Sequence, residues 1–390
     1  MIQLIKSTFY KEEEIKRKLC KFILASDKLS IGKECKKFET RFAKWQGRKY
    51  CVMVNSGSSA NLAIIQALLN LGKIKKNDYV GFSAVTWSTN VMPLMQLGLF
   101  AIPVDVELDT LNVSSKKLLQ VLEKYPLKMF FLTNLLGFCD DIDEIKKLCH
   151  KKKIILIEDN CESLGTEYKG RKLGNFGMAS TFSFYVGHHL STIEGGAICT
   201  DNEELETMLQ MVRAHGWDRN LTEQKQIKIR VKHNVNSTFY SRYTFYDLGY
   251  NFRTTEINGF IGNAQMQYLD EIISRRRDNF LKIATLIYKK TNEYYPLRYQ
   301  HIDLLSNFAM PVICKSQKIR KDLVEKCKDK VEIRPIVGGD MVLQPFYKKY
   351  INNYIDENVN ARIIHEQGLY FGNNPELTQA EIKELIEIFS

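Results

Sequence analysis

The amino-acid sequence predicts an α/β protein with a mostly parallel central sheet. Seven short apolar runs, rich in β-branched and aromatic residues, recur between residues 50 and 201. Several of them are continuously apolar, which is typical of strands buried on both faces of a sheet. Helix-like segments lie between them, and such alternation favours parallel pairing. The 390 residues, 44% of them hydrophobic, suffice for one large domain and a smaller one.

The expected strands follow one another at fairly even spacing. They are residues 50–56, 78–87, 99–106, 128–137, 153–160, 180–186 and 195–201. The helix-like segments between them are SSANLAIIQALLNLG, STNVMPLMQLG, SSKKLLQVLEKY and DIDEIKKLCHKKK. Ser or Asp opens several of these segments, as an N-cap should, because its side chain accepts a bond from a free N–H group of the first turn.

The pattern changes after residue 202. NEELETMLQMVRAHG predicts a helix, and the polar stretch from Trp217 to about Asp247 has little periodicity. That stretch is too long for an ordinary connection, so we expect a functional loop. Residues 255–290 read as one long helix or two, and the remainder mixes short strands and helices. We therefore expect a large domain over residues 1–250 and, over 251–390, a linking helix and a small α+β domain.

Composition narrows the functional classes. The longest apolar stretches fall far short of the roughly 20 residues needed to cross a bilayer, and the N-terminus does not resemble a signal peptide. Nine cysteines without a CxxC or CxC pair indicate reduced thiols in the cytoplasm. The net charge of +11 fits either a lysine-rich solvated surface or attraction to a polyanionic small molecule such as a sugar nucleotide. No nucleic-acid motif is present.

Three strand ends carry candidate binding residues. In NSGSSANL, Gly57 allows a tight turn before a helix whose free N–H groups could hold a phosphate, although such junctions are common. Asp159 in IEDNCES ends a buried strand, where ligands of open α/β sheets bind, but an N-cap or ion-pair role fits equally. Trp87 in AVTWSTN could stack on a planar ring or lie in the core.

These segments, together with SFYVGHHLSTIEGG, RAHGWDRN, LGYNFRTTEINGFIG and IRPIVGG, resemble the DegT/DnrJ/EryC1/StrS family of pyridoxal-phosphate sugar aminotransferases. The landmarks occur in the right order along nearly the whole chain. The resemblance implies the aspartate-aminotransferase (type I) fold, with a large domain built on a mixed, mostly parallel sheet and a smaller C-terminal domain. It also implies pyridoxal 5′-phosphate or its amine form, pyridoxamine 5′-phosphate, as the cofactor.

The resemblance assigns roles residue by residue. Gly57, Ser58 and Ser183 would contact the cofactor phosphate. Trp87 would stack on the ring. Asp159 would contact the pyridine nitrogen and Glu162 the ring hydroxyl. Asn251 would reach the phosphate bound by the other subunit of a homodimer with shared active sites. Substrate contacts are implied, less specifically, for His215, Arg219 and Arg334.

The chain departs from the family at one position. Aligning Ser183-Phe184 and Glu194-Gly195-Gly196 with the family pattern puts His188, not His189, where the aminotransferases have the lysine that forms a Schiff base with the cofactor. Imidazole cannot form that bond. A histidine with a pKa near neutrality could instead act as the acid–base group. A zinc pair is disfavoured, since neighbouring residues of an extended segment face opposite ways. We expect His189 to be structural.

This departure resembles the 3-dehydratase branch of the family, which acts on nucleotide-linked 4-keto-6-deoxy sugars. HHLSTIEGG, EDNCES and RAHGWDRN look closest to its GDP-linked type. The expected activity is loss of the C3 hydroxyl from a hexose or heptose, with glutamate regenerating the amine cofactor. A cluster-containing type needs four thiolates, and no clustered cysteines occur, so no iron–sulfur cluster is expected. The alternatives are a nucleotide-sugar aminotransferase, using Lys169 or Lys172, and a non-catalytic dimer partner.

Overall fold

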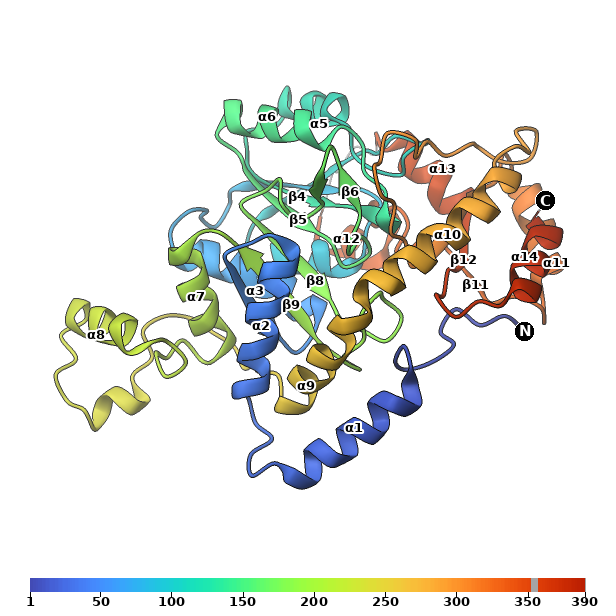
Figure 1. Cartoon of the computed structure of the whole chain (residues 1–390). Helices are drawn as coiled ribbons and strands as arrows, with labels where there is room; N and C mark the ends of the chain where they lie inside the picture. Colours follow the sequence, from blue (N-terminus) through green and yellow to red (C-terminus); the bar gives the residue numbers. More distant parts are fainter. Residues whose placement is uncertain (352–356, 390) are drawn as a thin grey trace.

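The seven expected strands form one sheet in a computed structural model, which describes residues 1–351 and 357–389 (Figure 1). In chain order they are β1 (Tyr50–Val54), β2 (Tyr79–Ser83), β3 (Phe100–Val104), β4 (Leu127–Thr133), β5 (Ile155–Asp159), β8 (Ala179–Ser183) and β9 (Gly196–Thr200). Their spatial order is β1-β9-β8-β5-β4-β2-β3. Only β9 runs antiparallel to its neighbours within this sheet. The prediction of a mostly parallel sheet is confirmed.

Helices cover both faces of this sheet, which explains the continuous apolar runs. In β4, Met129 and Phe131 pack in the core that also contains residues of α3 (Gly57–Asn70) and α7 (Glu203–Arg213). Their neighbours Phe130 and Leu132 face the opposite core, with α5 (Ser115–Leu122) and α6 (Ile142–Lys152). Successive side chains of a strand point to opposite faces, so a strand covered on both sides is apolar throughout.

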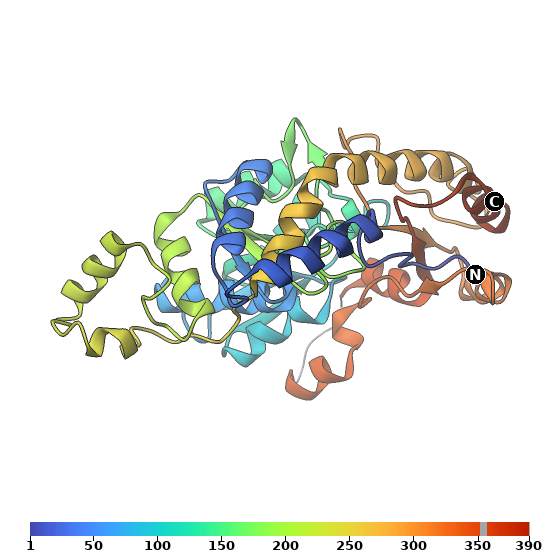
Figure 2. The same ribbon diagram turned by 60° about the horizontal axis from the view of Figure 1, so that its bottom comes forward.

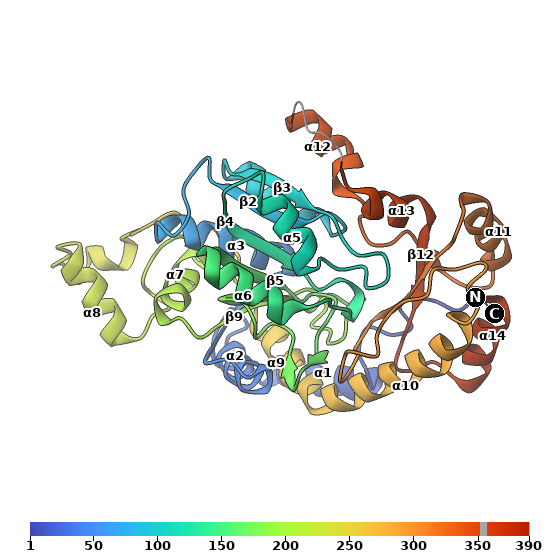
Figure 3. The ribbon, with the colours of Figure 1, turned by 90° about the horizontal axis from the view of Figure 1, so that it is seen from above.

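The segments that follow resolve two open points of the sequence. Residues 255–290 contain two helices, α9 (Glu256–Gln265) and α10 (Leu269–Ile287), joined by a short 3-10 turn (Met266–Tyr268). The stretch 217–247 was expected to be a loop, and this is wrong in part, because it contains α8 (Glu223–Lys232). No residue of α8 is buried, so its sequence carries no apolar stripe. Figures 2 and 3 show α8 projecting at the end of the molecule opposite the termini.

A second sheet lies in the C-terminal part of the chain. It consists of β10 (Ala309–Ile313), β12 (Gly368–Gly372) and β11 (Ile333–Arg334), in that order. The chain's first residues join this region, since Ile2 pairs with Val331. The domain boundary near residue 250 stays a prediction. The remaining elements are α1 (Glu12–Ala25), α2 (Lys33–Gln46), α4 (Met92–Gln96), β6 (Glu167–Tyr168), β7 (Arg171–Lys172), α11 (Gln317–Cys327), α12 (Pro345–Tyr350), α13 (Val359–Gln367) and α14 (Gln379–Phe389).

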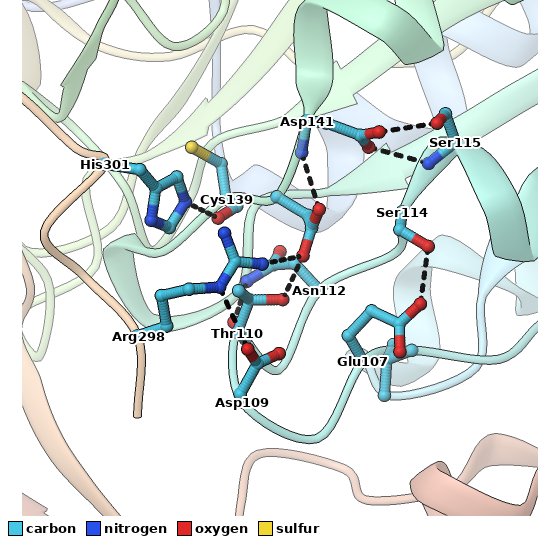
Figure 4. A network of polar contacts seen from close by, with 12 residues as sticks. Glu107, Asp109, Thr110, Asn112, Ser114, Ser115, Cys139, Asp141, Arg298 and His301 are labelled. Atoms are coloured by element: carbon cyan, nitrogen blue, oxygen red, sulfur yellow. Dashed lines mark hydrogen bonds and ion pairs between the residues drawn. The ribbon is translucent and has the colours of Figure 1, made fainter. Parts of the chain in front are cut away.

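A polar network fixes the connection between α10 and β10 to the large sheet (Figure 4). The guanidinium of Arg298 contacts Asp109 and Asp140, each at 2.9 Å. Thr110 donates a hydrogen bond to Asp140 at 2.8 Å, and the His301 ring contacts the Cys139 carbonyl at 2.9 Å. Burial raises the pKa of Asp140 above its usual range.

Among the described helices, none is both long and apolar enough to cross a membrane.

Candidate active site

The carboxyl ends of the parallel strands open into a cavity of about 500 Å³. Its lining comes from the segments after β1, β2, β5 and β8 and from the region of the second sheet, where Arg334 lies in β11, Tyr370 in β12 and Phe308 directly before β10. Eight of the predicted site residues meet there, namely Gly57, Ser58, Trp87, Asp159, Glu162, Ser183, His188 and Arg334. The cavity therefore lies where open α/β sheets bind ligands.

The start of α3 forms a cradle that fits a phosphate. Ser56 caps the helix by accepting a bond from the Ser59 N–H group at 3.0 Å. Within the described chain, the N–H groups of Gly57 and Ser58 have no acceptor. A Cβ atom on Gly57 would lie 2.7 Å from the Cβ of Ser183. Glycine thus permits close approach here, instead of the tight turn expected, and free N–H groups at a helix start favour an anion.

Asp159 lies at the end of β5, is 4% exposed and faces the cavity. One carboxylate oxygen, Oδ2, accepts bonds from the side-chain amides of Asn61 at 2.9 Å and Asn90 at 2.7 Å. The other, Oδ1, accepts a bond from the Cys161 N–H group at 2.9 Å. A buried carboxylate held only by uncharged donors favours a cationic N–H partner, so the site fits a protonated pyridine ring.

Glu162 and Trp87 also line the cavity. Glu162 accepts a hydrogen bond from the Leu136 N–H group at 2.9 Å. Burial raises the pKa of Glu162 to about 8, with a smaller contribution from the negative charge of Asp159. Glu162 is therefore mostly protonated at neutral pH and can donate a hydrogen bond. Trp87 is 53% exposed at the cavity, which rules out a core role and leaves its indole free to stack.

The two histidines face different surroundings. His188 lines the cavity, and its ring packs edge-on against Tyr185 and Phe308, with centroids 5.9 and 5.3 Å apart. His189 is 4% exposed, and it is not one of the described residues that line this cavity. The expectation of a near-neutral pKa for His188 is wrong, since burial lowers it to about 4. Its imidazole is neutral at physiological pH and available as a base.

The predicted substrate residues His215, Arg219 and Arg334, and the predicted cofactor-binding residue Asn251, divide into two groups. Arg334 reaches the cavity from β11 and forms an ion pair with Glu332 at 2.6 Å. His215, Arg219 and Asn251 are not among the described residues that line it. Arg219 instead lies over the rings of Trp217 and Tyr243, each at 4.2 Å.

Sequence reasoning missed several lining residues. Asn61 and Asn90 stand within the quoted SGSSANL and AVTWSTN segments, so their nearness to a strand end was a usable signal. Tyr370 lies in β12 of the second sheet, and Phe308 directly precedes β10. Only the packing of that sheet over the strand ends reveals them, and no local pattern marks them.

Comparison with known proteins decides the family. The model described as the DegT/DnrJ/EryC1/StrS aminotransferase family matches residues 10–390. The chain belongs to this family. Within the DegT/DnrJ/EryC1/StrS family it is similar to the GDP-4-keto-6-deoxy-D-mannose 3-dehydratase of Escherichia coli O55:H7. The two are 37% identical over 383 residues, covering 96% of this chain and 97% of the relative.

Solved structures of such dehydratases share the fold of this family member. The E. coli GDP-4-keto-6-deoxy-D-mannose-3-dehydratase with bound hydrated PLP superposes with a TM-score of 0.90 at 35% identity. The match covers 100% of this chain and 99% of the E. coli chain. A GDP-4-keto-6-deoxymannose-3-dehydratase with a trapped PLP-glutamate geminal diamine also gives a TM-score of 0.90, at 34% identity and with both chains covered to 100%.

Proposed function

We propose that this chain is a pyridoxamine-phosphate-dependent 3-dehydratase of a GDP-linked 4-keto-6-deoxy sugar. The observation that carries the proposal is that the cavity lining contains His188 and, among the described residues, no lysine. A lysine is required to tether the cofactor covalently, and in the family's aminotransferases it completes amino transfer to the sugar. A site with only an imidazole favours elimination over amino transfer.

The two lysines considered as substitutes do not reach the cavity. Lys169 is exposed and forms an ion pair with Asp143 at 2.7 Å. Lys172 donates a hydrogen bond to the Trp45 carbonyl at 2.9 Å. Both side chains belong to the β6–β7 hairpin. The aminotransferase alternative is therefore less well supported.

The chain's own residues can perform the chemistry of elimination. When bound, the cofactor supplies the amine that joins the sugar ketone and a ring that withdraws electrons. Asp159 would hold negative charge beside the ring nitrogen, and Gly57 and Ser58, which also line the cavity, would offer N–H groups to the phosphate. The neutral His188 ring would take a proton from C4′, the carbon that carries the cofactor's amine, and the electron pair of that C–H bond would expel the C3 hydroxyl. His188 would return the proton to this hydroxyl, which would leave as water. Hydrolysis of the released amino sugar gives the ketone and ammonia.

The substrate class follows from charge and from the relatives. A nucleotide diphosphate is anionic, and Arg334 brings a cation to the cavity of a chain with a net charge of +11. The relative at 37% identity is named for a GDP-linked sugar, and a solved dehydratase holds glutamate joined to the cofactor. We therefore place the chain in dideoxysugar biosynthesis with glutamate as the amino donor. No iron–sulfur cluster is needed in this scheme.

The proposal includes a homodimer with shared active sites. Within the described chain, Asn251, His215 and Arg219 all lie outside the cavity lining. Asn251 is exposed, and the other two precede the projecting α8. Exposed aromatic and aliphatic side chains gather on the same segment, among them Phe239, Tyr240, Tyr243 and Leu248, each at least 70% exposed. Such a surface favours burial against a second copy of the chain, where these residues could complete the partner's site.

Product analysis tests the proposal. The purified protein is incubated with pyridoxal phosphate, glutamate and either GDP- or CDP-linked 4-keto-6-deoxy sugars. Mass spectrometry should show the GDP-linked product lighter by one oxygen atom, with one 2-oxoglutarate and one ammonia formed per turnover. A product whose sugar has gained an amino group in place of the keto oxygen would identify an aminotransferase, and unchanged substrate would support a non-catalytic partner. Preferential conversion of the CDP-linked sugar would contradict the nucleotide assignment.

A further inference from the structure

The hydrogen bonds of the Asp159 carboxylate are unevenly divided. Oδ2 accepts two bonds, from the amides of Asn61 and Asn90, whereas Oδ1 accepts one, from the Cys161 N–H group. A carboxylate offers about four acceptor positions, two on each oxygen. N–H groups of the protein fill three of them, and the fourth, on Oδ1, has no N–H donor, although the weakly donating Cys161 thiol also contacts this carboxylate. Because Asp159 lines the cavity, its carboxylate can accept a bond from one further N–H group, on a ligand in the cavity.

The donors are uncharged and firmly placed. Asn61 and Asn90 are each 1% exposed, and they come from α3 and from the 3-10 turn after β2 (Ser88–Asn90). Their amide nitrogens must face Asp159, because a flipped amide would set its oxygen against the carboxylate. Uncharged donors solvate the negative charge without cancelling it. The charge of Asp159 thus stays available to a ligand in the cavity.

We propose that Asn61 and Asn90 are positioning residues for the cofactor ring. Together they would hold Oδ2 of Asp159 so that Oδ1 presents its remaining acceptor position to the N–H group of a protonated pyridine, a stronger donor than the Cys161 thiol. This inference rests on the pyridoxal-phosphate chemistry of the proposed function, and it adds the two residues that set how tightly the ring nitrogen is held.

The test is a binding titration on the cofactor-free full-length protein, followed by absorbance. Two ligands are compared, pyridoxal phosphate and its carbocyclic analogue, in which the ring nitrogen is replaced by C–H. Asn61→Leu and Asn90→Leu should each weaken pyridoxal-phosphate binding about tenfold or more, the size expected when a bond to a charged group is lost. Binding of the analogue should change far less, since it has no N–H group for Asp159.

A matched control separates positioning from general damage. Asn134 is also 1% exposed, but its side-chain amide donates to Glu158 and Asn160 instead of the Asp159 carboxylate. Asn134→Leu should lower the thermal unfolding midpoint to an extent similar to Asn61→Leu and Asn90→Leu. It should leave the ratio of the affinities for the two ligands at the wild-type value.

Asn61→Asp provides a test that a purely structural role would not pass. The new carboxyl stands beside Asp159, and the like charge raises its pKa. When protonated it can donate to Oδ2 as the amide does. The ratio of the Asn61→Asp affinity for pyridoxal phosphate to the wild-type affinity, both measured at the same pH, should therefore approach one at low pH. This ratio should fall as the pH rises. Asn61→Leu should show no such recovery.

The outcomes distinguish this inference from the proposed function. Wild-type protein that fails to bind pyridoxal phosphate would overturn both. If wild type prefers pyridoxal phosphate to the analogue, and the leucine variants keep that preference unchanged, the positioning role alone is overturned. The same conclusion follows if these variants lose affinity for both ligands equally, or if Asn61→Asp shows no dependence on pH relative to wild type.

Discussion

At the scale of single residues, we expect two titratable groups that line the cavity, His188 and Glu162, to impose opposite pH dependences on stability. Burial lowers the pKa of His188 from 6.5 to about 4, so unfolding takes up a proton between these values. The contribution of His188 to the free energy of unfolding is fully present above pH 6.5 and is lost as the pH falls through about 4. His188→Asn should therefore flatten the pH dependence of the unfolding midpoint in this window. The assignment would be contradicted if the free energy of unfolding, measured in urea, changed between pH 4.5 and pH 7 by the same amount in His188→Asn as in wild type.

Glu162 acts in the other direction. Its pKa is raised from 4.5 to about 8, mainly by burial, so the folded state holds a proton that the unfolded state releases. Its contribution is present below pH 4.5 and is lost as the pH rises through about 8. Glu162→Gln should therefore gain stability relative to wild type between pH 5 and pH 8.5. Equal differences at both pH values would show that Glu162 is ionised in the folded protein.

At the scale of elements, the segment 217–253 carries the prediction of shared sites. Asn251 is exposed, outside the cavity lining of the described chain, and held by a bond from Arg253 at 2.9 Å. Mixing Asn251→Ala subunits with His188→Asn subunits should restore one competent site per heterodimer. Dehydration by the exchanged mixture, well above that of either variant alone, would support the assignment. Inactivity, with subunit exchange shown by native mass spectrometry, would refute it.

The elements also show how far the sequence predicts the structure. Buried strands such as β4 and β5 were predicted because continuous apolar runs follow directly from a sheet covered on both faces. α8 was missed because it buries no side chain and so lacks periodicity. Trp87 and Asp159 could be placed at strand ends, and hence at the cavity. Phe308 and Tyr370 could not, since their place depends on how the second sheet packs.

At the scale of the whole molecule, Arg298 connects the large sheet to the chain that leads into the second sheet (Figure 4). Arg298→Met leaves the buried Asp140 with fewer partners, and we expect a loss of about 1 kcal/mol in the free energy of unfolding. Lys169→Met is the control, because the Lys169–Asp143 pair has a lysine side chain 61% exposed and should contribute little. Equal effects of both variants in urea unfolding would contradict a special role for this network.

The central claim is that His188 occupies the place of the tethering lysine, and borohydride reduction tests it most directly. The protein is loaded with pyridoxal phosphate, reduced, digested and searched for cofactor-bearing peptides by mass spectrometry. Wild type should carry no covalently bound cofactor. His188→Lys should carry it on the peptide that contains position 188 and should lose most dehydration, about 10²–10⁴-fold, because the acid–base imidazole is gone. His189→Lys should remain unlabelled. A reduced adduct on any lysine of the wild-type chain, or labelling of His189→Lys alone, would contradict the account.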